Sequence, residues 1–466
     1  MRHTKLAIAA MALAVLAGCG GSSPEAGDQT VRVKFSSQVS FGDSLSDVGT
    51  YNVGTVAALK GGKFTINGDN TAINATLTGR NWTELVAAQL GLAAPCAAMT
   101  GLEGDASKGF SVARVNHAGC YGYAQGGARV TNPVGPGNAL TGSALGALTV
   151  PVVTQVANHL ALSGGKFKGD EIVFVMAGGN DVLFQLSKLS ADATAAGNAA
   201  GAKAGVQAFI ASLVPQLAAG ATDPADAAKN ILAVATAAAG RTGATLTTIT
   251  QESVAVAGIQ PGNTAVRDQA VYSPMVAKAS AAATTAGAAA GVAAGAAYAT
   301  AQGPVLVEAL KTAGTELATL VKTQIIGKGA NYVTVNNLPD VATTPSGRGQ
   351  SAETRALINA MASAFNGALT AGLAGESKAV IVDVFWVSND QATNPGPYGL
   401  TNVSEPACDL TAAKNPLGTA LTCNGGNLKT GDISHYSFAD EVHPTPYNNL
   451  LLARYVSRSL VTKGWL

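Results

Sequence analysis

The sequence contains few charged residues. Asp, Glu, Lys and Arg make up 12% of its 466 residues, and 29 Lys and Arg nearly balance 28 Asp and Glu. A protein that holds a nucleic-acid backbone needs a large basic surface, because every phosphate carries a negative charge. The composition therefore argues against nucleic acid as a partner, and it does not indicate the oligomeric state.

Long apolar runs are also scarce, and the run at the N-terminus is too short to span a bilayer. Leu6 to Leu16 are uninterrupted apolar residues, and Arg2 and Lys5 precede them. A short apolar stretch after a positively charged start is typical of a secretory signal peptide. We therefore expect residues 1–18 to be a signal peptide and the protein to be exported.

The end of this signal, "LAGC", resembles the lipobox of bacterial lipoproteins. That resemblance implies that Cys19 is the lipidated first residue of the mature chain, whereas the alternative is an ordinary signal peptide with an incidental cysteine. Residues 19–35 include a Gly/Ser/Pro-rich stretch of the kind found in flexible tethers. Position 20 is Gly rather than Asp, which by the same resemblance favours anchoring to the outer membrane through Cys19.

Only five cysteines are present, and four remain when Cys19 is set aside. An even number in an exported chain predicts disulfides. Closeness in sequence favours Cys96 with Cys120 and Cys408 with Cys423. A metal site is the alternative, but no cysteine has a C-x-x-C neighbour or a well-spaced histidine, so we expect no metal.

Apolar runs rich in β-branched residues alternate with helical patterns. The predicted strands are residues 37–41, 171–178, 331–337 and 379–387, and the predicted helices are 81–92, 152–162, 352–373 and 447–461. Continuous apolar strands separated by helices are typical of a parallel sheet that is covered on both faces. The expected class is α/β.

The pattern changes between residues 187 and 326, where alanine and glycine dominate and aromatic residues nearly vanish. Glycines recur every four residues at Gly197, Gly201 and Gly205, and again at Gly287, Gly291 and Gly295. Residues four apart share one helix face, and glycine lets another backbone approach closely. We expect a helical insertion that forms a cap near the active site; a disordered insert is the alternative.

The stretch "VSFGDSLSDVGTYN" contains Ser44 directly behind an apolar run. A serine hydroxyl becomes a nucleophile only beside a general base, which a third group must orient. His443 follows Asp440 by three residues, so that one turn of backbone can bring the carboxylate to its Nδ1. His435 follows Asp432 at the same spacing and stays open as a second candidate.

Four segments together resemble the SGNH/GDSL family of serine esterases and lipases. They are "FGDSLSDVG", "YAQGGARV", "AGGNDV" and "DEVHPT", and they occur in the family's order. The resemblance implies a flavodoxin-like three-layer hydrolase domain over residues 36–186 and 327–466. The 187–326 insertion lies outside it.

The resemblance also implies residue roles. Ser44 is the expected nucleophile, with Asp440 and His443 completing the triad. The backbone N–H groups of Ser44 and Gly127 and the side-chain amide of Asn180 are the expected oxyanion donors. Asp47 and Asp181 are expected to hold loops by accepting hydrogen bonds from neighbouring N–H groups.

The expected activity is hydrolysis of carboxylic acyl esters through an acyl-serine intermediate, without a cofactor. The alternatives are an acyltransferase, in which an alcohol replaces water, and a catalytically dead lipid- or glycan-binding lipoprotein. The sequence does not show which acyl chain or alcohol the substrate carries.

Overall fold

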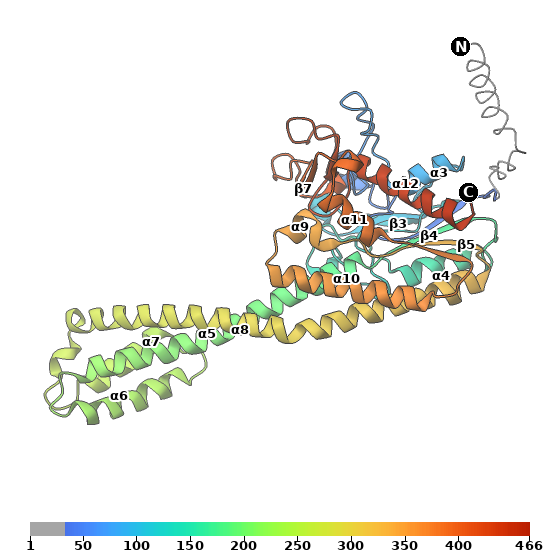
Figure 1. Ribbon diagram of the computed structural model, residues 1–466. Coiled ribbons are helices and arrows are strands. Elements are labelled where there is room, and N and C mark those ends of the chain that lie inside the picture. Colours follow the sequence, from blue (N-terminus) through green and yellow to red (C-terminus); the bar gives the residue numbers. More distant parts are fainter. Residues whose placement is uncertain (1–32) are drawn as a thin grey trace, which may run out of the picture. The chain divides into compact units, whose positions relative to one another are not determined.

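A computed structural model describes residues 33–466 of the chain (Figure 1). The expected signal peptide, Cys19 and most of the expected tether lie outside the described residues. The chain divides into two compact units. The first contains residues up to Ala177 together with Ala318–Ser346 and Thr370–Leu466, and the second contains Gly178–Leu317 and Gly347–Leu369.

The first unit is built on a four-stranded parallel sheet in the order β1-β4-β5-β6. Its strands are β1 (Gln38–Gly42), β4 (Ile172–Met176), β5 (Tyr332–Asn336) and β6 (Ala379–Val382). Helices flank this sheet, and a large helical insertion follows β4 in the chain. The predicted α/β class is therefore confirmed.

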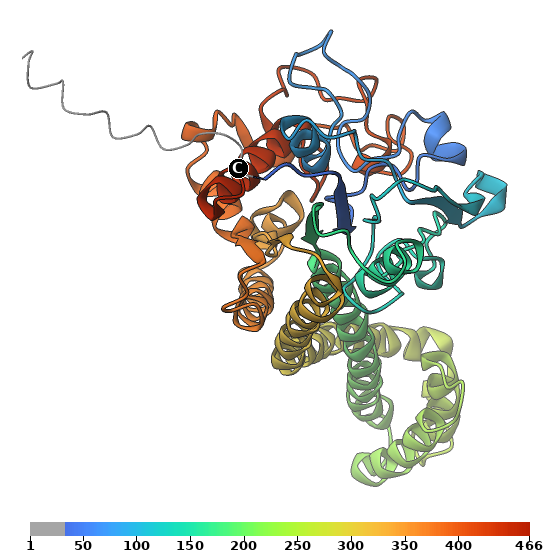
Figure 2. The ribbon, with the colours of Figure 1, turned by 90° about the vertical axis from the view of Figure 1, so that its right-hand side faces the viewer.

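Both faces of the sheet are covered, which explains why its strands are apolar throughout. On one face, Ile172 and Phe174 pack against Trp82 of α3 (Trp82–Gln89) and Val456 of α12 (Pro446–Lys463). Successive side chains of a strand alternate between faces. On the other face, the ring of Phe41 contacts His159 of α4 (Val152–Leu162), and Figure 2 shows α4 and α12 on opposite sides of the strands.

The remaining strands form two small sheets. They are β2 (Met99–Glu103) with β3 (Ser111–Asn116), which are antiparallel, and β7 (Asn402–Pro406) with β8 (Tyr436–Phe438). The other α-helices outside the insertion are α2 (Gly54–Ala58), α9 (Pro345–Arg348), α10 (Ala352–Gly372) and α11 (Val384–Thr393).

The strand predicted over residues 379–387 was too long. β6 ends at Val382, and the rest of the apolar run forms the start of α11. Asp383 lies at the N-cap of this helix, where its Oδ1 accepts a hydrogen bond from the Trp386 N–H at 3.1 Å. A helix N-cap thus divides an apolar run that the hydrophobicity pattern predicts as a single strand.

Two disulfides close loops of the first unit. Cys96 pairs with Cys120 and Cys408 pairs with Cys423, with Cα–Cα distances of 5.0 and 6.1 Å. Both expected pairings are thus present. Among residues 33–466, no cluster of three or more His, Cys, Asp or Glu side chains is arranged to hold a metal ion.

The insertion in the second unit is helical. It comprises α5 (Gly179–Ala218), α6 (Pro224–Ala239), α7 (Leu246–Ala257) and α8 (Gln269–Leu320). The first three helices and the start of α8 share an apolar cluster that includes Phe209, Leu213, Ile231 and Ile249. None of the helices within the described residues is long and apolar enough to cross a membrane. A role for the insertion as a cap stays a prediction.

The two glycine-rich segments of the insertion lie against each other. A Cβ added to Gly201 would come within 2.8 Å of the Gly287 carbonyl oxygen, and one added to Gly197 within 2.7 Å of that of Gly291. These distances are shorter than real Cβ contacts. Glycine at every fourth residue therefore lets the backbones of α5 and α8 come into contact.

This contact predicts opposite effects for one substitution at two helical glycines. Gly201→Ala should lower the stability of the second unit, because the methyl group must push α5 away from α8. Gly367→Ala in α10, where a Cβ would meet nothing within 4 Å, should raise it by up to about 1 kcal/mol through helix propensity. Thermal unfolding followed by circular dichroism measures both, and a Gly201→Ala protein as stable as wild type would contradict the close contact.

Candidate active site

The candidate nucleophile lies at the carboxyl end of β1, the edge at which parallel sheets carry their ligand sites. Gly42 ends the strand with a φ of 147°, and a Cβ there would lie 2.0 Å from the Met176 carbonyl oxygen of β4. Only glycine fits where the backbones of β1 and β4 approach so closely. The chain then turns: the Asp43 N–H donates to the Met176 oxygen at 3.2 Å, and Ser44 follows, 9% exposed.

Ser44, His443 and Asp440 form a hydrogen-bonded chain. The Nε2 of His443 lies 2.8 Å from the Ser44 Oγ. The Nδ1 of the same ring lies 2.8 Å from Asp440 Oδ2 and 3.0 Å from its Oδ1. This is the arrangement in which a carboxylate fixes the imidazole tautomer and leaves Nε2 free to accept a serine proton.

The carboxylate of Asp440 also shapes the turn that carries the histidine. Its Oδ1 accepts the N–H groups of Val442 at 2.9 Å and His443 at 2.7 Å, and its Oδ2 accepts the Ala420 N–H at 2.7 Å. Burial by itself would raise the pKa of Asp440, but the neighbouring His443 and these donors together outweigh it and hold the pKa below its usual range. Asp440 is therefore ionised at neutral pH.

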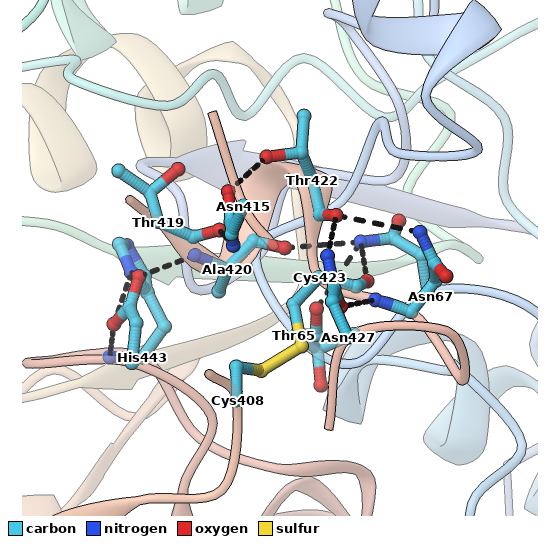
Figure 3. The surroundings of a disulfide bond; sticks show 12 residues. Thr65, Asn67, Cys408, Asn415, Thr419, Ala420, Thr422, Cys423, Asn427 and His443 are labelled. Atoms are coloured by element: carbon cyan, nitrogen blue, oxygen red, sulfur yellow. Dashed lines mark hydrogen bonds and ion pairs between the residues drawn. A yellow bond between two sulfur atoms is a disulfide. The ribbon is translucent and has the colours of Figure 1, made fainter. Parts of the chain in front are cut away.

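The donor at Ala420 belongs to the loop that the Cys408–Cys423 disulfide closes (Figure 3). The buried Asn67 side chain holds this loop from the other side, since its Nδ2 lies 3.0 Å from the Ala420 oxygen and 2.9 Å from the Cys423 oxygen. A disulfide and a buried amide thus fix the N–H that orients Asp440. The disulfide was predicted, but nothing in the sequence near Asn67 indicated its contacts.

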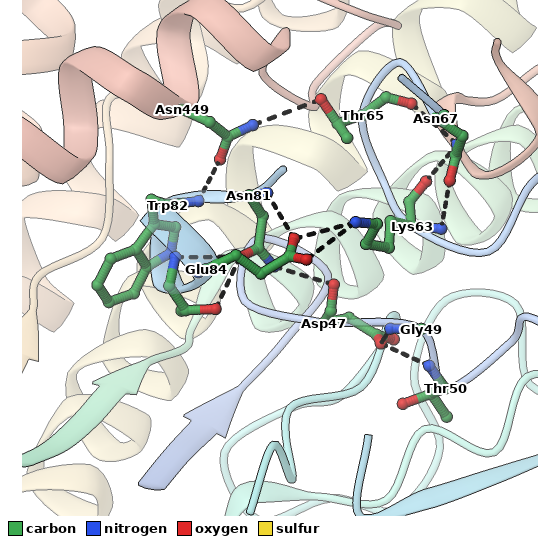
Figure 4. Close-up of polar contacts among 12 residues, drawn as sticks. Asp47, Gly49, Thr50, Lys63, Thr65, Asn67, Asn81, Trp82, Glu84 and Asn449 are labelled. Atoms are coloured by element: carbon green, nitrogen blue, oxygen red, sulfur yellow. Dashed lines mark hydrogen bonds and ion pairs between the residues drawn. The ribbon is translucent and has the colours of Figure 1, made fainter. Parts of the chain in front are cut away.

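The segment before Asn67 contacts the histidine turn directly. The Phe64 ring lies against the imidazole of His443, with ring centroids 4.8 Å apart. The Thr65 Oγ1 donates to the Pro444 oxygen at 2.9 Å, and Figure 4 shows Thr65 beside Asn449 of α12. Aromatic and hydroxyl contacts therefore hold both sides of the turn.

Asp47 ties the serine segment to the segment that carries Gly127. Its buried carboxylate accepts N–H groups from Gly49 at 2.9 Å, Thr50 at 2.8 Å and Gly126 at 2.9 Å (Figure 4 shows the first two). Burial raises the pKa of Asp47 to about 6, and the three N–H donors limit that rise. The predicted loop-holding contacts of Asp47 are present.

Gly127, the expected oxyanion donor, lies directly after Gly126. The preceding segment runs beside β1, because the Tyr123 N–H donates to the Ser40 oxygen at 2.8 Å and the Gln125 N–H to the Gly42 oxygen at 3.1 Å. Gly127 has a φ of 79°, and a Cβ on it would lie 2.3 Å from the Pro136 oxygen. The position requires glycine and lies at the same end of the sheet as Ser44.

Asn180 and Asp181 lie in the first turn of α5, the helix that follows β4. Both side chains are buried, at 6% and 4% exposure. The role of Asn180 as an oxyanion donor stays a prediction.

The second candidate histidine has other neighbours. His435 Nδ1 lies 3.1 Å from the Ser434 Oγ, which in turn bonds to Asp432, and its ring meets that of Tyr447. Asp432 therefore bonds Ser434 within a local turn and not the ring of His435. Asp440 does bond the ring of His443, whose other nitrogen faces Ser44.

Comparisons with known proteins give a local similarity. A segment of 65 residues, 14% of this chain, is 40% identical to a GDSL esterase/lipase of Arabidopsis thaliana. The match spans 17% of that relative's length. No family model matches the chain.

The matching Asp-x-x-His spacings offer a paired test. Asp440→Asn should lower kcat for an ester by roughly 10³- to 10⁴-fold, because an amide facing Nδ1 favours the tautomer whose Nε2 already carries a proton. Asp432→Asn should leave kcat near wild type, because its carboxylate bonds Ser434. Steady-state kinetics of the two folded variants decides the assignment; equal losses would contradict it.

Proposed function

We propose that this protein hydrolyses carboxylic acyl esters through an acyl-serine intermediate. The observation that carries the proposal is the continuous hydrogen-bonded chain from Ser44 through His443 to the buried, ionised Asp440. The local similarity to a GDSL esterase/lipase supports the same reaction class.

In the first step, His443 Nε2 removes the Ser44 proton while Oγ attacks the ester carbonyl carbon. Asp440 stabilises the imidazolium that forms and keeps its ring in place. The imidazolium then gives the proton to the leaving alcohol oxygen, so that the C–O bond breaks and an acyl-serine remains. In the second step, His443 removes a proton from water while the water oxygen attacks the acyl carbon. The imidazolium then returns the proton to the Ser44 Oγ as the acyl C–O bond breaks, which releases the acid and restores Ser44.

The negative charge that develops on the carbonyl oxygen needs donors that are already in position. We assign this role to the backbone N–H groups of Ser44 and Gly127. The Asp47 carboxylate supports it, because it binds the N–H of Gly126 and thereby fixes the chain next to Gly127. Asn180 is the side-chain donor that the family resemblance implies.

Neighbouring serines provide a matched test of the nucleophile. Ser44→Ala should abolish ester hydrolysis and covalent labelling by a serine-reactive phosphonate, because no hydroxyl then faces His443. Ser46→Ala removes a buried hydroxyl that has no hydrogen-bond partner among the described residues, and it should keep both properties. Intact-mass spectrometry after labelling reads the result directly.

Persistent labelling of the Ser44→Ala protein would show that another residue is the nucleophile. Loss of labelling in both folded variants would mean that labelling depends on the whole turn around Ser44 and not on the Ser44 hydroxyl alone.

We also propose that the mature protein is anchored to the outer membrane through lipidated Cys19. The support lies in the sequence: a short apolar signal, the "LAGC" motif and a polar tether. A lipidated cysteine can hold a chain at a bilayer without a spanning helix.

Detergent partitioning of the protein, produced with its own signal in a Gram-negative host, tests the anchor. Wild type should enter the detergent phase, and Cys19→Ser should remain in the aqueous phase because it offers no thiol for lipidation. Wild-type protein that is freely soluble after signal removal would contradict the proposal, whatever its esterase activity.

A further inference from the structure

A pocket in the first unit lies beside the candidate triad. It has about 680 Å³ of space, counted with the solvent at its mouth. Leu45, the residue after Ser44, lines it, and so do Val442 and Pro444, which flank His443 on both sides. The residues next in sequence to Ser44 and His443 therefore form part of the pocket wall.

The wall of this pocket is mainly hydrocarbon. Apolar side chains come from five elements: Met176 at the end of β4, Val384 and Val387 of α11, Val403 of β7, Phe438 of β8, and Leu452 of α12. A polar substrate group would lose water at this apolar wall, whereas an apolar chain gains free energy by leaving water.

Most of the polar side chains that line the pocket have partners within the protein. The Ser388 Oγ accepts the Asp340 N–H at 2.9 Å, and the Asn448 Nδ2 donates to the Ser437 Oγ at 2.9 Å. Asp340, the only charged residue of the lining, holds the Asn389 amide at 2.7 Å and the Ala342 N–H at 3.1 Å. None of these contacts favours a charged or strongly polar ligand group.

We propose that this pocket binds an aliphatic chain of the ester substrate. The inference rests on the proposed esterase function and specifies its substrate class: esters with a hydrocarbon chain rather than acetylated glycans. The chain belongs either to the acyl group held on Ser44 or to the leaving alcohol near His443. Both sources present the same chemistry to the wall, and the experiment separates them.

The test fills the pocket from two elements and uses a neighbouring exposed position as the control for each. Ala392 of α11 and Val403 of β7 line the pocket, whereas their neighbours Thr393 and Ser404 are exposed and do not. The variants are Ala392→Phe with its control Thr393→Phe, and Val403→Phe with its control Ser404→Phe. Two lining variants keep the test valid if one of them fails to fold.

Two substrate series are assayed with each folded protein. In p-nitrophenyl esters from acetate to dodecanoate only the acyl chain grows, and in alkyl acetates from methyl to octyl only the alcohol grows. In wild type, kcat/KM should rise about fourfold for each methylene that enters the pocket. In the lining variants, the ratio of kcat/KM for the long ester to that for the short one should fall at least tenfold in one series. Both controls should keep the wild-type ratio.

The series that responds identifies the chain that the pocket holds. If neither ratio changes in either folded lining variant while acetate is still hydrolysed, the pocket does not bind the chain and the proposal is overturned. Failure of the proposed function looks different, because wild type would then hydrolyse none of these esters and the phosphonate would not label Ser44.

Discussion

The carboxylate of Asp440 is the interaction on which the candidate site depends. It accepts the Nδ1–H of His443 and three backbone N–H groups, from Val442, His443 and Ala420. A buried carboxylate is costly unless donors surround it, and here the donors outweigh that cost and lower its pKa. The same contacts set the turn, the imidazole tautomer and the distance from His443 to Ser44. The Asp440 carboxylate therefore both holds the loop and orients the general base.

Segments far apart in the chain keep this group in place. Ala420 is held by the Cys408–Cys423 loop and by Asn67, and Phe64 lies against the imidazole. On the other side of Ser44, Asp47 joins the serine turn to the segment of Gly127. Loops can carry catalytic groups only where buried polar contacts restrict them, and most of these contacts are side chain to backbone.

The second unit is held together in a different way. Its α5 and α8 meet through glycines, so the contact buries backbone and small methyl groups and relies on close van der Waals approach. The sheet of the first unit instead buries large side chains such as Trp82, Phe174 and Phe41. One chain thus contains a conventional apolar core and a helical region whose packing requires the absence of side chains.

The local features of this protein follow from its sequence. The alternation of apolar strands and helical periods predicted the α/β class, the fourfold glycine spacing predicted a close helix contact, and an even cysteine count with short separations predicted two disulfides. It misplaced the end of β6, because a capping aspartate inside an apolar run does not change the hydrophobicity pattern. Spacing alone left His435 open beside His443, since both follow an aspartate by three residues; the "DEVHPT" resemblance favoured His443, and the tertiary structure brings that ring to Ser44. The tertiary structure alone brought Asn67, Ala420 and the residues of the apolar pocket together, because these contacts join positions tens to hundreds of residues apart and no local spacing encodes them.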